Sequence, residues 1–134
     1  MHLLLGLALL AAPVVQGDRF CADIQRLSAA ATQEKSFESL YAAKFVPVLL
    51  RGCNRGANGF FCHQSMLPPE ITYETMAVRI SDCLSGAVIS PGPRWPEQKR
   101  KIVTGGGLIF ELEESGADRA HVGRILHIEI KVQP

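Results

Sequence analysis

The sequence predicts an exported α+β domain in which two helices pack on one face of a mostly antiparallel sheet of four to five strands. Three observations lead to this fold class. Two groups of apolar residues recur at helical spacing, two segments alternate apolar and polar residues, and an even number of cysteines follows an apolar leader. The predicted order is helix, strand, strand, helix, strand, strand, with one optional further strand, and disulfide bonds stabilise the whole.

An uncharged apolar run from Leu3 to Val15 opens the chain. It is too short for a transmembrane helix, which needs about 20 apolar residues, and it has the length of a signal-peptide core. We therefore expect residues 1–17 to be a signal peptide and residues 18–134 to form a single α+β domain without a membrane span. The alternative is a buried N-terminal helix of a cytosolic protein.

The first predicted helix runs from Arg19 to Gln33, with Asp18 as its N-cap. Apolar residues fall along one stripe of this helix, at Phe20, Ile24, Leu27 and Ala31. A second, shorter group follows at Phe37, Leu40, Tyr41 and Phe45. Its pattern leaves open whether it forms another helical turn.

A β-hairpin is predicted next, with a strand from Phe45 to Cys53 and a second strand from Gly59 to Met66. The intervening NRGANG stretch is rich in glycine and asparagine, which accept the backbone angles of tight turns. A turn centred on Ala57 and Asn58 places Cys53 directly opposite Cys62. In that register neither face of the predicted hairpin is cleanly apolar near its open end.

The second predicted helix has its apolar stripe at Tyr73, Met76, Ala77, Ile80 and Leu84, and Gly86 ends it. A proline-rich loop from Ser90 to Pro96 follows. Period-two alternation then predicts one strand around Leu108–Leu112 and another around Leu126–Val132, and Lys99–Val103 is the optional further strand. The glycines 105–107 are expected to form a bend or bulge, because no lysine and no helix follows them as in a phosphate-binding loop.

The four cysteines are interpreted as two disulfides, because short exported chains with an even number of cysteines fold in an oxidising compartment. The preferred pairing is Cys53 with Cys62 and Cys21 with Cys83. Four cysteines allow three pairings, and a bond between Cys62 and Cys83 stays open. A metal site is disfavoured because Cys53 and Cys62 lie too far apart in sequence for a zinc motif, and no cofactor is predicted.

Two groups of residues could carry function. The first is a binding loop that combines an aromatic residue with basic side chains: Arg94, Trp95, Lys99, Arg100 and Lys101. Its alternative is that Trp95 packs on the core and the charges are solvated. The second is the set His63, His121 and His127, for which cross-strand ion pairing is the simpler explanation than acid and base catalysis.

The composition narrows the function further. The chain has 14 lysines and arginines against 13 aspartates and glutamates, so no basic surface for nucleic acid is expected. No catalytic sequence motif is present. We therefore expect a periplasmic or extracellular, non-enzymatic protein-binding module, such as an inhibitor, an immunity protein or an envelope-associated factor. The alternative is a small secreted hydrolase that cleaves nucleic acid or cell-wall polymer with a histidine base.

Overall fold

The computed structural model describes residues 19–92, 99–116 and 123–134. The helices in this part of the chain are α2 (Arg19–Glu34), α3 (Glu38–Ala42) and α4 (Tyr73–Asp82). The strands are β1 (Gly52–Gly56), β2 (Gly59–Gln64), β3 (Val88–Ser90), β4 (Lys99–Gly105), β5 (Leu108–Ser115) and β6 (Ile125–Val132). The predicted signal peptide, residues 1–17, and the predicted cap Asp18 lie outside the described residues.

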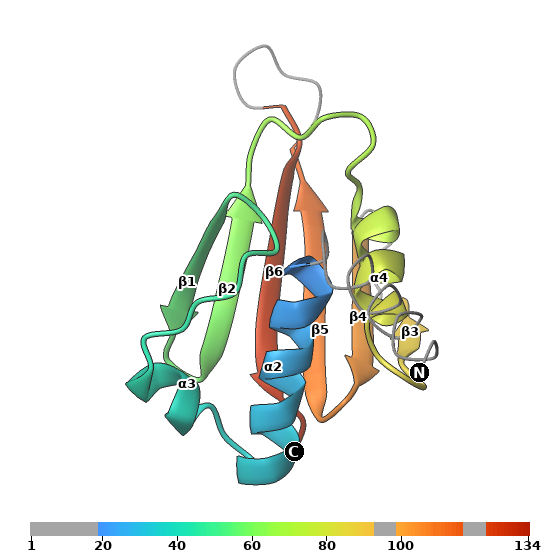
Figure 1. Cartoon of the computed structure of the whole chain (residues 1–134). Helices are drawn as coiled ribbons and strands as arrows, with labels where there is room; N and C mark the ends of the chain where they lie inside the picture. Colours follow the sequence, from blue (N-terminus) through green and yellow to red (C-terminus); the bar gives the residue numbers. More distant parts are fainter. Residues whose placement is uncertain (1–18, 93–98, 117–122) are drawn as a thin grey trace, which may run out of the picture.

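The six described strands form one sheet in the order β1-β2-β6-β5-β4-β3, and every pair of neighbours is antiparallel (Figure 1). The mixed helix and strand content and the antiparallel sheet are confirmed. The predicted number of four to five strands was wrong, because the three residues Val88–Ser90 add an edge strand along β4. So short a segment shows no periodicity in the sequence. The predicted number of two helices was also too low, because the segment that the sequence left open as another helical turn forms the five-residue helix α3.

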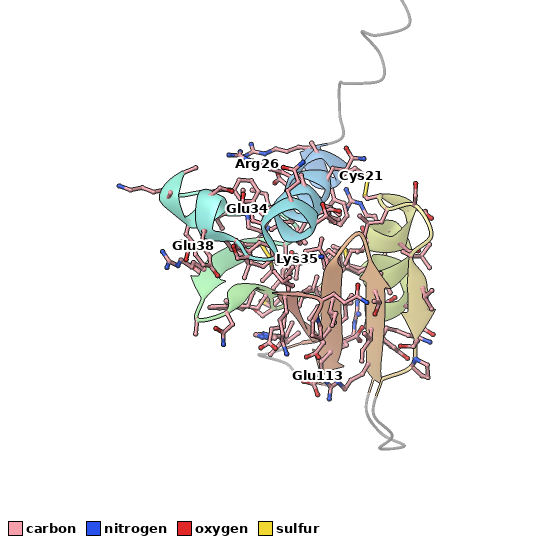
Figure 2. All side chains as sticks on the ribbon, turned by 90° about the horizontal axis from the view of Figure 1, so that it is seen from below. Cys21, Arg26, Glu34, Lys35, Glu38 and Glu113 are labelled. Atoms are coloured by element: carbon pink, nitrogen blue, oxygen red, sulfur yellow. A yellow bond between two sulfur atoms is a disulfide. The ribbon has the colours of Figure 1, made fainter. Side chains whose placement is uncertain are left out.

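The helices pack on one face of this sheet and form a single core with it. Figure 2 shows α2 and α3 on one side of the sheet and Glu113 on the other side. Helix α4 packs against β4 and β5. The predicted apolar stripe of α2 is buried, as are Met76, Ala77 and Ile80 of α4. Alternate residues of β5 and β6 complete the core: Leu108, Phe110, Leu112, Leu126, Ile128 and Ile130.

The segment before β1 is the main error of the sequence prediction. The strand predicted from Phe45 begins only at Gly52. The N–H of Val48 donates to Asp23 Oδ2 at 2.9 Å, and the N–H of Arg51 donates to Gln64 Oε1 at 3.2 Å. These donors are thus bound to side chains instead of a neighbouring strand, so the ladder does not extend past Gly52.

The hairpin turn and the cysteine pairs follow the preferred interpretation of the sequence. Cys53 is the register partner of Cys62 across β1 and β2, and the two form a disulfide with their Cα atoms 3.9 Å apart. A second disulfide joins Cys21 in α2 to Cys83 at the end of α4, with a Cα distance of 5.0 Å. Each thiol of the chain is therefore in a disulfide.

The glycines between β4 and β5 form a two-residue turn, where the sequence analysis expected a bend or bulge. Gly105 pairs with Leu108, and Gly106 and Gly107 between them have φ angles of 58° and 78°. Ser28 Oγ in α2 donates a hydrogen bond of 2.6 Å to the carbonyl oxygen of Gly106. The turn is therefore also hydrogen-bonded to α2.

Across the described ranges, no helix is both long enough and apolar enough to cross a membrane.

Candidate functional site: the open face of the sheet

One face of the sheet has no described helix over it, and we call it the open face. Strand residues alternate between faces, so the register of the six strands fixes which side chains point away from the helices. The larger side chains of the open face are Asn54, Phe61, His63, Val88, Arg100, Ile102, Thr104, Ile109, Glu111, Glu113, Ile125, His127, Glu129 and Lys131. Charged, aromatic and aliphatic groups are thus mixed on one surface.

Lys131 is the centre of an ion-pair cluster on the open face. Its Nζ lies 3.1 Å from Glu129 Oε1 and 3.4 Å from Glu111 Oε1. The hydrogen bond with Glu129 has the largest effect and raises the pKa of Lys131 above its usual value. Burial acts in the opposite direction, and the charges of Glu111 and Glu129 raise the pKa further. The lysine is therefore positively charged at neutral pH.

Both described histidines of the open face lie in one row across four strands. His63 in β2 is the register partner of His127 in β6, and Glu113 in β5 is the partner of His127 on its other side. Arg100 in β4 is in turn the partner of Glu113. His121, the third candidate histidine, lies outside the described residues. The structure therefore brings two of the three predicted histidines together, beside a carboxylate.

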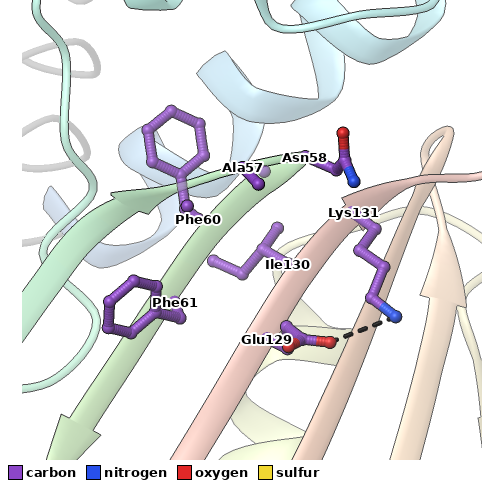
Figure 3. Close-up of a pocket in the computed structure, with 9 residues that line it drawn as sticks. Ala57, Asn58, Phe60, Phe61, Glu129, Ile130 and Lys131 are labelled. Carbon is purple, nitrogen blue, oxygen red and sulfur yellow. Dashed lines mark ion pairs between the residues drawn. The ribbon is translucent and has the colours of Figure 1, made fainter.

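The ring of Phe61 stacks on the imidazole of His127, with centroids 6.1 Å apart and planes inclined by 17°. On the other side of Phe61 the open face is hollow. Gly56 and Gly59 are register partners there, so neither strand places a side chain at that point. Phe61, Glu129, Lys131 and the turn at Ala57 and Asn58 surround this hollow, which has a volume of about 290 Å³ (Figure 3).

The predicted binding loop stays a prediction. Arg94 and Trp95 lie outside the described residues. Of the other members, Lys99 and Lys101 in β4 point to the face of the sheet that the helices cover, whereas Arg100 points to the open face. Lys99 Nζ lies 3.9 Å from Glu114 Oε2. The described members therefore do not form one basic surface.

A buried ion pair at the end of β5 and the start of β6 was not predicted from the sequence. Glu114 occupies a core-facing position with only 7% of its surface exposed. It accepts hydrogen bonds from the N–H of Tyr73, at the start of α4, and from Arg124 Nη1, at 3.0 and 3.2 Å. Arg124 also donates to the carbonyl oxygens of Pro68 and Ile71, each at 2.8 Å. The signal was available, because Glu114 continues the inward alternation of Leu108, Phe110 and Leu112.

Within the described ranges, no group of three or more histidine, cysteine, aspartate or glutamate residues is arranged to hold a metal ion. This finding covers His63, His127 and Glu113, which lie in one row but do not converge on a common point.

Comparison with models of protein families, with curated proteins and with solved structures finds no match to this chain. Any function must therefore be inferred from the geometry of the site.

Proposed function

We propose that this protein is a small exported binding module without enzymatic activity, which holds another protein against the open face of its sheet. The observation that supports the proposal is a six-stranded surface that no described helix covers. Partly buried Phe61, Ile102 and Ile109 lie on it among charged side chains. Such a mixture of apolar anchors and polar groups is typical of protein interfaces.

The construction of the sheet favours binding by a rigid surface. Neighbouring strands are joined in continuous antiparallel register, and two disulfides tie the hairpin and the helices. A surface that is already ordered loses little conformational entropy when a partner binds. The same two disulfides fit an oxidising compartment, either the periplasm or the extracellular medium.

A charge reversal at Glu113 tests whether the partner binds to the open face. It is exposed on the open face, and no cation of the described residues lies within ion-pair distance of its carboxylate. Glu38 in α3 is also an exposed glutamate, but it belongs to the helical side of the molecule (Figure 2). The two residues therefore form a matched pair for charge reversal.

The experiment is affinity capture from an envelope extract with the oxidised full chain as bait. We expect one stoichiometric protein to bind the wild-type chain and the Glu38→Lys variant equally, and to be lost with Glu113→Lys. A partner that is lost only with Glu38→Lys would place the interface on the helices and contradict the proposal. Recovery of no protein with any bait would contradict it as well.

A second candidate, a hydrolase that cleaves a polymer without a metal, is favoured by the row His63, His127 and Glu113. Two imidazoles side by side can act as general base and general acid, and a neighbouring carboxylate can orient one of them. We rank this candidate second because both imidazoles are exposed, and catalysis benefits from a site that excludes water.

Substitution of the histidines separates the two candidates. If the protein is a binding module, the wild-type chain, His63→Ala and His127→Ala all cleave neither RNA nor cell-wall glycan. In a hydrolase, the wild-type chain cleaves one of these polymers and each variant loses at least about a hundredfold in rate, the usual contribution of an acid or base. Such a loss would replace our first proposal with the second.

A further inference from the structure

The hollow beside Phe61 exists because two opposed positions carry glycine, and only one of them needs it. At Gly59 an added Cβ would collide with the carbonyl oxygen of Ile130 in β6. At Gly56 an added Cβ would make only ordinary contacts, the nearest at 3.5 Å from Phe61 Cδ1. The fold therefore requires glycine at position 59, whereas glycine at position 56 keeps the hollow empty.

The polar groups of the hollow keep free hydrogen-bonding capacity. The ammonium group of Lys131 has three N–H donors, and Glu129 and Glu111 engage two of them. Glu129 is 48% exposed and can accept further hydrogen bonds with its second oxygen. Both residues line the hollow, so one donor and one acceptor lie side by side at its edge. Figure 3 shows the ion pair of Lys131 with Glu129, with the ammonium group on the side of β6 that is away from Phe61.

The charges around the hollow exclude strongly ionic ligands. Lys131 is positive and lies between the two carboxylates of Glu111 and Glu129, so the cluster has a net charge of 1 − 2 = −1. An anionic ligand would meet two carboxylates, and a cationic one would have to displace or approach the ammonium group. A neutral ligand that offers both a donor and an acceptor fits this arrangement best.

Phe61 supplies the apolar contact. His127 covers one side of the Phe61 ring, and the hollow lies on the other side, next to Gly56 and Gly59. An aromatic ring attracts C–H groups through the negative potential of its face. The volume of about 290 Å³ is at the lower end of the range for small-molecule sites, which corresponds to a ligand of about one ring.

From these features we infer that the hollow binds a neutral N-acetylhexosamine unit of a glycan chain. The C–H face of the sugar ring packs on Phe61, the acetamido N–H donates to Glu129, and the acetamido oxygen accepts from Lys131. This inference does not depend on the proposed protein partner, because the glycan site lies at the turn end of the open face and the test of the partner uses Glu113.

The test is a titration of the oxidised full chain with the disaccharide of N-acetylglucosamine, monitored by two-dimensional amide NMR. The disaccharide is added up to roughly 50 mM, because ligands this small typically have millimolar dissociation constants. We expect saturable shifts confined to residues 56–61 and 129–131. Gly56→Leu should abolish them by filling the hollow, and Phe61→Ala should weaken binding by roughly two- to tenfold through the lost ring contact. Glu74→Gln, at an exposed position of α4 outside the open face, should bind like the wild type.

Two further ligands identify what the site recognises. Glucose lacks the acetamido group, and N-acetylalanine methylamide has amide groups without the sugar ring. Equal binding of either ligand would overturn the inference, as would shifts that persist in Gly56→Leu or the absence of saturable shifts with the disaccharide. The amide spectrum of each variant without ligand reports whether the variant is folded. If Gly56→Leu does not fold, the result with Phe61→Ala decides the test.

Discussion

Arg124 shows how one side chain can hold together segments that are distant in sequence. It pairs with the buried Glu114 at 3.2 Å and donates to the carbonyl oxygens of Pro68 and Ile71. The guanidinium group thus attaches the loop before α4 to the end of the sheet, together with the backbone hydrogen bond from the N–H of Leu67 to the carbonyl oxygen of Arg124. The side chain of Glu114 is only 4% exposed, so its ion pair with Arg124 is a buried one.

We predict that Arg124→Met lowers the free energy of unfolding by about 3 kcal/mol, because it leaves a buried carboxylate without its main partner. Lys131→Met is the matched control, since it removes a cation from an exposed ion-pair cluster and should cost less than about 1 kcal/mol. Urea unfolding of both variants measures the difference. Equal losses would show that Glu114 is solvated more than its burial indicates.

The residues of the candidate site were predictable from the sequence, but their arrangement was not. His63 and His127 were recognised as chemically capable residues from the sequence. Their adjacency could not be predicted, because it depends on the pairing of β2 with β6 across more than sixty residues of chain. The hollow beside Phe61 was not predicted either. The expected turn register already implied that Gly56 faces Gly59, but Glu129 and Lys131 come beside them only through the pairing of β2 with β6.

At the scale of elements, the turn between β4 and β5 is both a hairpin and a support for α2. Gly106 has a φ of 58°, and a Cβ there would collide with Ser28 Oγ. Gly86, after α4, has a φ of 69°, but an added Cβ would meet nothing within 4 Å. These two glycines separate the cost of the backbone conformation from the cost of the contact.

We predict that Gly86→Ala destabilises the protein by about 1 kcal/mol, the cost of a left-handed conformation for a residue with a Cβ. Gly106→Ala should cost roughly 1 to 3 kcal/mol more, because α2 must also shift away from the turn. Thermal unfolding of the two variants tests this order. A smaller loss for Gly106→Ala would mean that α2 is not held closely at the turn.

The elements themselves were predictable to different degrees. Helices α2 and α4 and strands β5 and β6 follow from their periodicity, because each has one face in the core and one in water. The structure of the segment before β1 does not follow from its sequence pattern. Its apolar residues Leu49 and Leu50 are buried outside any strand, and Asp23 accepts a hydrogen bond from the backbone N–H of Val48. A tertiary hydrogen bond there overrides the local preference for strand.

On the scale of the whole molecule, the two disulfides constrain very different lengths of chain. Cys21 and Cys83 are 62 positions apart and join α2 to the end of α4, whereas Cys53 and Cys62 are nine apart within one hairpin. A longer closed loop removes more conformational entropy from the unfolded chain. The longer disulfide should therefore contribute more to stability.

We predict that replacing both Cys21 and Cys83 with alanine lowers the free energy of unfolding by about 4 kcal/mol, and that the same change at Cys53 and Cys62 costs about 3 kcal/mol. Urea unfolding of the two double variants under oxidising conditions provides the comparison. If the hairpin variant is the less stable one, the packing around the fully buried Cys62 outweighs loop entropy.

The α+β class, the antiparallel character of the sheet and the favoured cysteine pairing follow from local sequence patterns, because periodicity and turn residues act over short distances. The strand order, the edge strand β3, the buried pair of Glu114 with Arg124 and the composition of the open face arise only in the folded molecule. Each of these arises where segments distant in sequence meet, and local patterns carry no information about which segments will do so.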